Sequence, residues 1–220
     1  GRAVGGPCLD QTSVDRKLEP GDNNVQAHLR IAPPRLWQLH DPYLYRVTVK
    51  VSVGSGHDDE QSVRCGFRDF RIEDGYCRLN GKRLFLKCAH TGNETTTGYR
   101  IAPGTEDWLR RDLVNMKAMG FNAIRWIVGM PARYQLDLCD EIGLMVYEES
   151  RASWFLEDSP AMKERFDHSI SEMIMRDRNH PSIVIWGLLN ETGDGPVFRH
   201  AVATLPLVRS LDDTRVVLLS

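Results

Sequence analysis

The residues best suited to chemistry stand at the end of an apolar run. Residues 183–189 (IVIWGLL) are continuously apolar, and Asn190 and Glu191 follow directly. Strands inside a parallel sheet are buried on both faces and read as unbroken apolar runs, so the pair is predicted at the carboxyl edge of such a sheet. In a (β/α) barrel that edge holds the active site, where an amide beside a carboxylic acid suits acid–base work on a polar substrate. The alternative is a pair that caps the next helix or faces solvent.

Two more charged residues fall near predicted strand ends. Glu149 closes the segment 144–150 (LMVYEES), which predicts a second acid at the same edge; solvation or a salt bridge there is the alternative. Arg125 lies inside the otherwise apolar segment 122–128. A buried arginine needs carboxylate partners, and Glu149 or Glu191 would supply them. Such a pair would either support the site or serve as a structural ion pair.

Histidine and tryptophan side chains give weaker signals. His90 follows the first predicted barrel strand, where a hydrogen-bonding role is more common than catalysis. Trp154, in a loop after the third strand, is a candidate platform for stacking on a sugar ring. Core packing is the expected role of Trp186. His180 precedes its strand and is predicted to be structural, at the opposite end of the sheet.

Alternating strands and helices must position these side chains. Apolar patterns predict strands at residues 83–89, 122–128, 144–147, 182–190 and 215–219, and helices at 106–119, 132–142, 162–180 and 197–210. This alternation is typical of βαβ units and a parallel sheet. A complete (β/α)₈ barrel needs about 250 residues. We therefore predict an α/β fold, either an open sheet or an incomplete (β/α)₈ TIM barrel of about five βα units.

The first part of the chain is predicted to be all-β. Strand character at residues 25–31, 43–53 and 61–67, with a glycine turn at 54–56, favours a sandwich segment over residues 1–71. Residues 72–220 are assigned to the barrel portion. A hairpin turn at Asn80-Gly81 precedes its first predicted strand, residues 83–89. The chain starts at Gly1 and stops within a predicted strand, so we expect it to be a piece of a longer protein.

Composition excludes several classes of function. The 220 residues are 41% hydrophobic, enough for a sizeable core, and the net charge of −2 offers no basic footprint for nucleic acid. No apolar stretch is long enough to span a membrane. The five cysteines form no Cys-x-x-Cys, so neither a zinc site nor a disulfide framework is indicated. No cofactor-binding motif is recognised, no metal site follows from spacing, and the cellular location is not determined. A homo-oligomer is compatible with the sequence.

Several segments along the chain together match the pattern of a single known family. Residues 36–45 resemble the end of its immunoglobulin-like domain, and 66–68 (GFR) with 79–87 (LNGKRLFLK) resemble its entry into the barrel. The remaining matches are 120–125 (GFNAIR), 138–144 (LCDEIGL) and the acid/base segment 176–191. Together these segments resemble glycoside hydrolase family 2, the β-galactosidase and β-glucuronidase family. The resemblance implies an immunoglobulin-like sandwich segment, a (β/α)₈ TIM barrel and hydrolysis of β-galactosides or β-glucuronides. We expect no cofactor.

The resemblance also implies roles for individual residues. Family members are retaining enzymes with two carboxylates about 5–5.5 Å apart. Glu191 matches the acid/base, Asn190 the ligand of the sugar 2-hydroxyl, and Arg125 an arginine that supports the carboxylates. Glu149, His90 and Trp154 are the further substrate-binding candidates.

Three departures from the family pattern restrict these expectations. Residues 126–131 (WIVGMP) lack the histidine that usually follows the arginine, and His90 falls two places early. The family's nucleophile comes from the seventh barrel strand, whereas this chain ends near the fifth. The 220 residues alone are therefore predicted to be inactive. The alternative is a non-catalytic carbohydrate-binding or scaffold protein built on the same barrel.

Overall fold

The structure, a computed structural model, describes residues 6–54, 56–92 and 106–220. Its contacts divide the chain into two compact units, Gly1–Arg35 and Leu36–Ser220. Residues 6–35 of the first unit contain no helix or strand, so the strand predicted at residues 25–31 is wrong. A strand needs a neighbour for its backbone N–H and C=O groups, and strand propensity alone does not supply one.

A long hairpin opens the second unit. Strands β1 (Tyr45–Val53) and β2 (His57–Cys65) are antiparallel, with a register that runs from Tyr45 opposite Cys65 to Val53 opposite His57. The predicted strand at residues 43–53 and the glycine turn after it are confirmed. Val49, Val51 and Val53 lie on one face of the hairpin and are exposed. Since a sandwich needs a second sheet, the immunoglobulin-like arrangement stays a prediction.

A small antiparallel sheet follows, formed by β3 (Phe70–Glu73), β4 (Tyr76–Leu79) and β5 (Lys82–Leu84). The predicted hairpin turn joins β4 to β5, with φ of 51° at Asn80 and 76° at Gly81. The single strand predicted over residues 83–89 is wrong, because β5 ends at Leu84 and the next strand belongs to another sheet. The Asn122 side chain separates the two by accepting from the N–H of Lys87 (2.9 Å) and donating to the carbonyl of Phe85 (2.8 Å).

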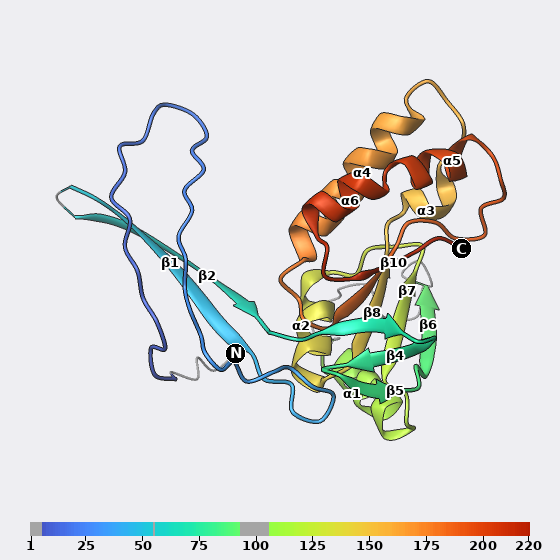
Figure 1. Ribbon diagram of the computed structural model, residues 1–220, viewed down its shortest axis with the longest axis horizontal. Coiled ribbons are helices and arrows are strands. Elements are labelled where there is room, and N and C mark those ends of the chain that lie inside the picture. Colours follow the sequence, from blue (N-terminus) through green and yellow to red (C-terminus); the bar gives the residue numbers. More distant parts are fainter. Residues whose placement is uncertain (1–5, 55, 93–105) are drawn as a thin grey trace. The chain divides into compact units, whose positions relative to one another are not determined.

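The main sheet is parallel and carries the predicted barrel strands. They are β6 (Cys88–Gly92), β7 (Ala123–Ile127), β8 (Met145–Glu149), β9 (Ile183–Gly187) and β10 (Val216–Leu218), side by side in chain order (Figure 1). A doubly wound sheet reverses its strand order at a switch point. No reversal occurs among these strands, so the sheet corresponds to a consecutive part of a (β/α) barrel.

The helices complete the βα units. They are α1 (Glu106–Ala118), α2 (Arg133–Ile142), α3 (Ala152–Phe155), α4 (Met162–Asp177), α5 (Pro196–Ala203) and α6 (Leu205–Leu211). The short helix α3 was not predicted. The single helix predicted over residues 197–210 is divided at Thr204, because Pro206 has no N–H to continue the ladder. None of the described helices is long and apolar enough to cross a membrane.

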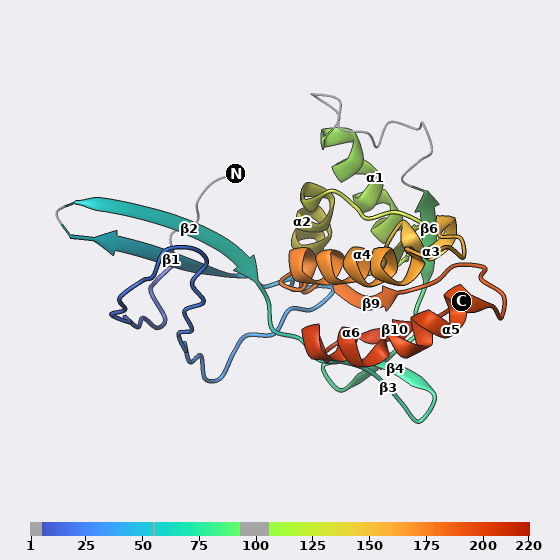
Figure 2. The same cartoon turned by 90° about the horizontal axis from the view of Figure 1, so that it is seen from above.

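Different elements pack on the two faces of the main sheet. Helices α1, α2 and α4 lie on one side and β3 and β4 on the other (Figure 2). On the helical side, Trp126 and Trp186 pack with Phe166 and other apolar side chains. On the opposite side, Trp37, Phe70 and Leu79 pack against the first residues of the strands. The three-stranded sheet therefore fills the side of the main sheet that a barrel would turn inwards.

Candidate active site

The predicted site residues gather at the carboxyl ends of β7, β8 and β9. Arg125 lies within β7, Glu149 is the last residue of β8, and Asn190 and Glu191 follow β9 by three and four residues. The register places Arg125 opposite Tyr147, and Glu149 opposite Gly187. Adjacent parallel strands thus bring residues far apart in the sequence to one edge of the sheet.

Arg125 connects two of the predicted site residues. Its Nε donates to Oε1 of Glu149 (2.6 Å) and its Nη2 donates to Oδ1 of Asn190 (2.7 Å). The predicted partnership of Arg125 with Glu149 is therefore present. Among the described residues, the structure gives no hydrogen bond or ion pair between Arg125 and Glu191.

Glu149 is completely buried and both of its oxygens are used. Oε1 accepts from Arg125, and Oε2 accepts from the backbone N–H of Val128 (2.9 Å). Val128 has a φ of 52°, which is rare for a β-branched residue and is maintained only where surrounding contacts require it. A buried carboxylate is costly unless it is paired and hydrogen-bonded. This carboxylate satisfies that condition and is suited to holding Arg125 in place.

Asn190 is held by three contacts. The residue is 3% exposed, its N–H donates to the carbonyl of Ser153 (2.8 Å), and its own carbonyl accepts from the hydroxyl of Thr192 (3.1 Å). Arginine only donates hydrogen bonds, so the amide oxygen must face Arg125. The amide NH₂ makes no hydrogen bond to a described residue and is the half of the side chain that remains for a ligand.

Glu191 differs from Glu149 in its burial and in its contacts. It is exposed, its φ is 51°, and its carboxylate has no hydrogen-bond or ion-pair partner in the described part of the chain. The backbone therefore turns sharply between a buried amide and an exposed acid. The two consecutive residues present different groups at the same edge of the sheet.

His90 and Trp154 also lie at this edge. His90, in β6, is exposed and stands opposite Arg125 in the register of β6 with β7. Trp154 is 52% exposed and lies in the short helix α3, five residues after Glu149, and not in a loop as predicted. Since Ser153 accepts the N–H of Asn190, helix α3 is tied to the same loop as Asn190. Trp186 is fully buried, which confirms its predicted core role.

Sequence reasoning missed three contributors to the site. Val128 supplies a backbone N–H from an unusual conformation, Tyr147 lies against Arg125, and Gly187 allows β8 side chains to approach β9. Glycine within an apolar strand indicates a close approach, and Gly187 carries this signal in the sequence. The roles of Val128 and Tyr147 have no comparable signal.

One group of possible metal ligands lies among the described residues, at the other end of the sheet. Single ligand atoms of Asp137, Asp140 and His180 lie within 4.8 Å of one another. All three are already engaged: His180 with Asp140 (2.7 Å), Asp140 with the N–H of Ser182 (3.0 Å), and Asp137 with Arg64 (2.5 Å). These contacts join β2, α2 and the start of β9, so the group is suited to a structural role.

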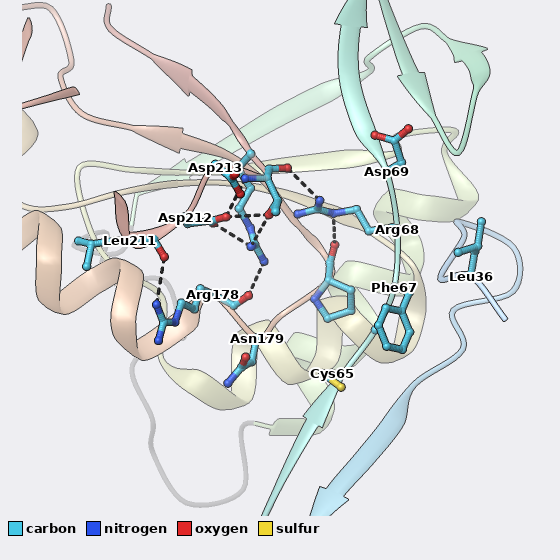
Figure 3. Close-up of a pocket in the computed structure, with 14 residues that line it drawn as sticks. Leu36, Cys65, Phe67, Arg68, Asp69, Arg178, Asn179, Leu211, Asp212 and Asp213 are labelled. Carbon is cyan, nitrogen blue, oxygen red and sulfur yellow. Dashed lines mark hydrogen bonds and ion pairs between the residues drawn. The ribbon is translucent and has the colours of Figure 1, made fainter. Parts of the chain in front are cut away.

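A cavity of about 520 Å³ is also formed at that end, and its lining, drawn in Figure 3, does not include Arg125. Its lining includes Arg68, Arg178 and Arg215, whose guanidinium groups point at backbone carbonyls. Arg68 donates to the carbonyls of Pro181, Thr214 and Ile183. Burial, and then the charge of Arg215, lowers the pKa of Arg68 to about 9. This cavity is a structural junction, and the chemistry-bearing residues lie elsewhere.

Comparison with known families gives a single assignment. The sequence model of the glycosyl hydrolases family 2 TIM barrel domain matches residues 70–220, and the model named Glycosyl hydrolases family 2 matches residues 9–68. The chain belongs to glycosyl hydrolase family 2. The parallel sheet over residues 88–218 is accordingly part of a family 2 TIM barrel, which is one of the two arrangements that the residue patterns left open.

Individual family 2 relatives are enzymes named for different sugars. A β-galactosidase of Aeromonas hydrophila is 33% identical over 186 residues, covering 80% of this chain and 18% of the relative. A putative β-glucuronidase of Formosa agariphila is 37% identical over 185 residues, covering 80% and 17%. The crystal structure of a β-galacturonidase from Eisenbergiella tayi bound to galacturonate superposes with a TM-score of 0.77 at 30% identity, covering 88% of this chain and 35% of that one. The chain thus spans about a fifth of the length of these curated relatives.

Proposed function

We propose that this chain is part of a retaining β-glycosidase that hydrolyses β-galactosides or β-glucuronides, with Glu191 as its acid/base. The observation that carries the proposal is the chain of contacts from Glu149 through Arg125 to Asn190. It fixes an amide NH₂ next to an exposed carboxylate at the carboxyl edge of a family 2 barrel. In this proposal Asn190 donates to the sugar 2-hydroxyl, and His90 and Trp154 contact the substrate.

Glu191 and Glu149 have different roles in the proposal. Glu191 would protonate the glycosidic oxygen in the first step and remove a proton from water in the second. Glu149 is a poor nucleophile because Arg125 and Val128 occupy both of its oxygens and it is fully buried. The nucleophile is therefore proposed to come from barrel residues outside positions 1–220, and we expect residues 1–220 alone to give no turnover.

The domain assignment belongs to the same proposal. Residues 1–71 would form part of an immunoglobulin-like sandwich, and residues 72–220 the first part of the catalytic barrel. Support comes from the match of residues 9–68 to the family and from the β1–β2 hairpin, one face of which carries exposed valines.

The test uses the full natural chain with aryl β-galactosides and aryl β-glucuronides. Replacing the acid/base lowers kcat mainly for substrates whose leaving group needs a proton, typically by 10²–10⁴-fold. Glu191→Gln should therefore reduce cleavage of a phenyl glycoside by about that factor and cleavage of a dinitrophenyl glycoside much less. Glu157→Gln, at an exposed position after α3, is the matched control and should behave like the parent.

Other outcomes decide against the proposal. Equal loss for both leaving groups, or no loss, would remove Glu191 from the acid/base role. A natural chain that binds these sugars but never cleaves them would favour the non-catalytic carbohydrate-binding protein.

A further inference from the structure

Gly187 has no room for a side chain. A Cβ at this position would lie 2.4 Å from Cε2 of Tyr147 and 2.5 Å from Cγ of Glu149. Both distances are shorter than any stable contact between carbon atoms, because attraction is greatest near 3.5–4.0 Å. Two side chains of β8 therefore lie directly over the backbone of β9, and Gly187 is what permits their positions.

Tyr147 occupies the centre of this arrangement. It is 8% exposed, stands opposite Arg125 in the register of β7 with β8, and lies two residues before Glu149 on the same face of β8. The Arg125 Cζ atom is 4.7 Å from the centre of the Tyr147 ring. A guanidinium within about 6 Å of a ring face is attracted by the ring quadrupole. The ring therefore supports Arg125 in addition to its polar contacts with Glu149 and Asn190.

The polar end of Tyr147 contributes less. Its hydroxyl oxygen is buried and makes no well-formed hydrogen bond to a described residue. Burial, and then the charge of Glu149, raises the pKa of Tyr147, so the phenol is neutral at every physiological pH. The contact that Tyr147 provides is the face of its ring.

We propose that Tyr147, seated on Gly187, is a positioning residue for recognition of the sugar 2-hydroxyl. The ring holds Arg125, Arg125 holds the amide oxygen of Asn190, and the amide NH₂ is thereby directed at the substrate. Without the ring, Arg125 can keep its ion pair with Glu149 and still rotate away from Asn190. The inference rests on the proposed function, because it assumes that Asn190 donates to a sugar.

The experiment compares an aryl β-glycoside with its 2-deoxy analogue in the full natural chain. The ratio of their kcat/KM values measures how strongly the enzyme uses the 2-hydroxyl. Tyr147→Leu should lower this ratio about tenfold, since loss of a desolvated cation–π contact frees Arg125. Gly187→Ala should lower this ratio as well, because the added methyl group would collide with both Tyr147 and Glu149 and displace the Tyr147 ring. Tyr147→Phe keeps the ring and should restore the parent ratio to within about twofold.

A second arginine–tyrosine stack gives a matched control. The Arg83 Cζ atom lies 3.5 Å from the centre of the Tyr76 ring, in the small sheet and away from the site. Tyr76→Leu removes a stack of the same type and should leave the ratio unchanged. If Tyr147→Leu does not fold, Tyr147→Met takes its place.

The outcomes separate the inference from the proposed function. If Tyr147→Leu and Gly187→Ala slow both substrates equally, or if Tyr147→Phe fails to restore the ratio, the ring does not position Asn190. If the parent cleaves the two substrates equally well, Asn190 has no role at the 2-hydroxyl and the inference also fails. If the parent cleaves neither, the proposed function is wrong.

Discussion

Arg68 and Arg215 donate to the same backbone carbonyl, that of Ile183 at the start of β9. The distances are 2.6 Å from Nη2 of Arg68 and 3.2 Å from Nε of Arg215. Asp212 accepts from Arg215 (2.8 Å) and supplies the negative charge that two neighbouring cations require. One polar junction thus ties the segment that precedes the small sheet to the beginnings of β9 and β10.

Arg68→Met should destabilise the fold by about 2–4 kcal/mol, because the carbonyls of Pro181, Ile183 and Thr214 lose a charged donor and the first two belong to buried residues. Urea unfolding of the protein measures the change. Arg71→Met removes a fully exposed arginine, paired with Asp69, and should leave the unfolding midpoint unchanged. Equal effects of the two substitutions would show that Arg68 is not a structural junction.

Asp212 should make the fold sensitive to acid. Burial alone would raise its pKa, but the charge of Arg215 and hydrogen bonds from Thr214 and Trp186 outweigh burial and lower the pKa. The folded protein therefore holds this proton less tightly than the unfolded chain. The resulting stability is complete above the unfolded pKa near 3.8 and is lost as the pH falls through the lower folded value.

Asp212→Asn should lower the free energy of unfolding at pH 7 by about 2 kcal/mol and should weaken its decline below pH 4. Unfolding curves between pH 2.5 and 7 measure both effects. The neighbouring Asp213 is exposed, so Asp213→Asn is the control, and its curves should follow the parent. An unchanged acid profile in Asp212→Asn would contradict the assignment.

Glu148 should lower the stability of the fold as the pH rises, whereas Asp212 lowers it as the pH falls. It is fully buried on the helical side of β8, and neither oxygen has a hydrogen-bond partner among the described residues; the nearest cation, Arg176, is 3.6 Å away. Burial, and then the charge of Asp177, raises the pKa of Glu148 well above its ordinary value. The folded protein retains a proton that the unfolded chain releases near pH 4.5, so stability falls as the pH rises above that value.

Glu148→Gln removes this penalty and should stabilise the protein by about 1–2 kcal/mol at pH 7, with little change near pH 4. Chemical unfolding at the two pH values gives the comparison. Exposed Glu157→Gln should show no pH-dependent difference from the parent. A destabilised Glu148→Gln variant at pH 7 would indicate that the carboxylate is charged and paired.

Arg125 and Glu149 should be energetically coupled. Arg125→Met leaves a buried carboxylate without its cation and should cost about 3–5 kcal/mol. Adding Glu149→Gln to that variant removes the uncompensated charge and should recover at least half of the loss. A double-mutant cycle on the free energy of unfolding measures the coupling, and additive effects of the two substitutions would contradict it.

Much of the barrel could be predicted because each βα unit carries its own pattern. Buried strands such as β9 read as apolar runs, and Gly143 ends α2 with a φ of 76° as its glycine suggests. The division of residues 83–89 could not be predicted, since it depends on the Asn122 side chain, which reaches back from the next strand. The sequence of residues 25–31 has strand propensity, but a strand forms only beside a partner strand, and these residues have none in the described part of the chain.

The residue types that meet around Arg125 could be predicted, but their geometry could not. A carboxylate partner for Arg125 could be predicted from the cost of burying an arginine alone, but the sequence left Glu149 and Glu191 as alternatives, and the structure pairs Arg125 with Glu149. The approach of Tyr147 and Glu149 to Gly187 depends on the register between β8 and β9, which no single strand encodes. The N–H of Val128 reaches Glu149 through a backbone conformation that its residue type disfavours.

The small antiparallel sheet has a consequence for access. Trp37, Phe70 and Leu79 pack against Ala123 and Met145 near the amino ends of the main strands, so this part of the inner face is solid and apolar. Polar side chains begin only with Arg125 and Glu149. The amino ends of these strands are therefore filled by packing, and the groups able to bind a polar ligand lie toward their carboxyl ends. In the proposed function, the sugar would therefore be recognised at the carboxyl ends of the strands and by the loops that follow them.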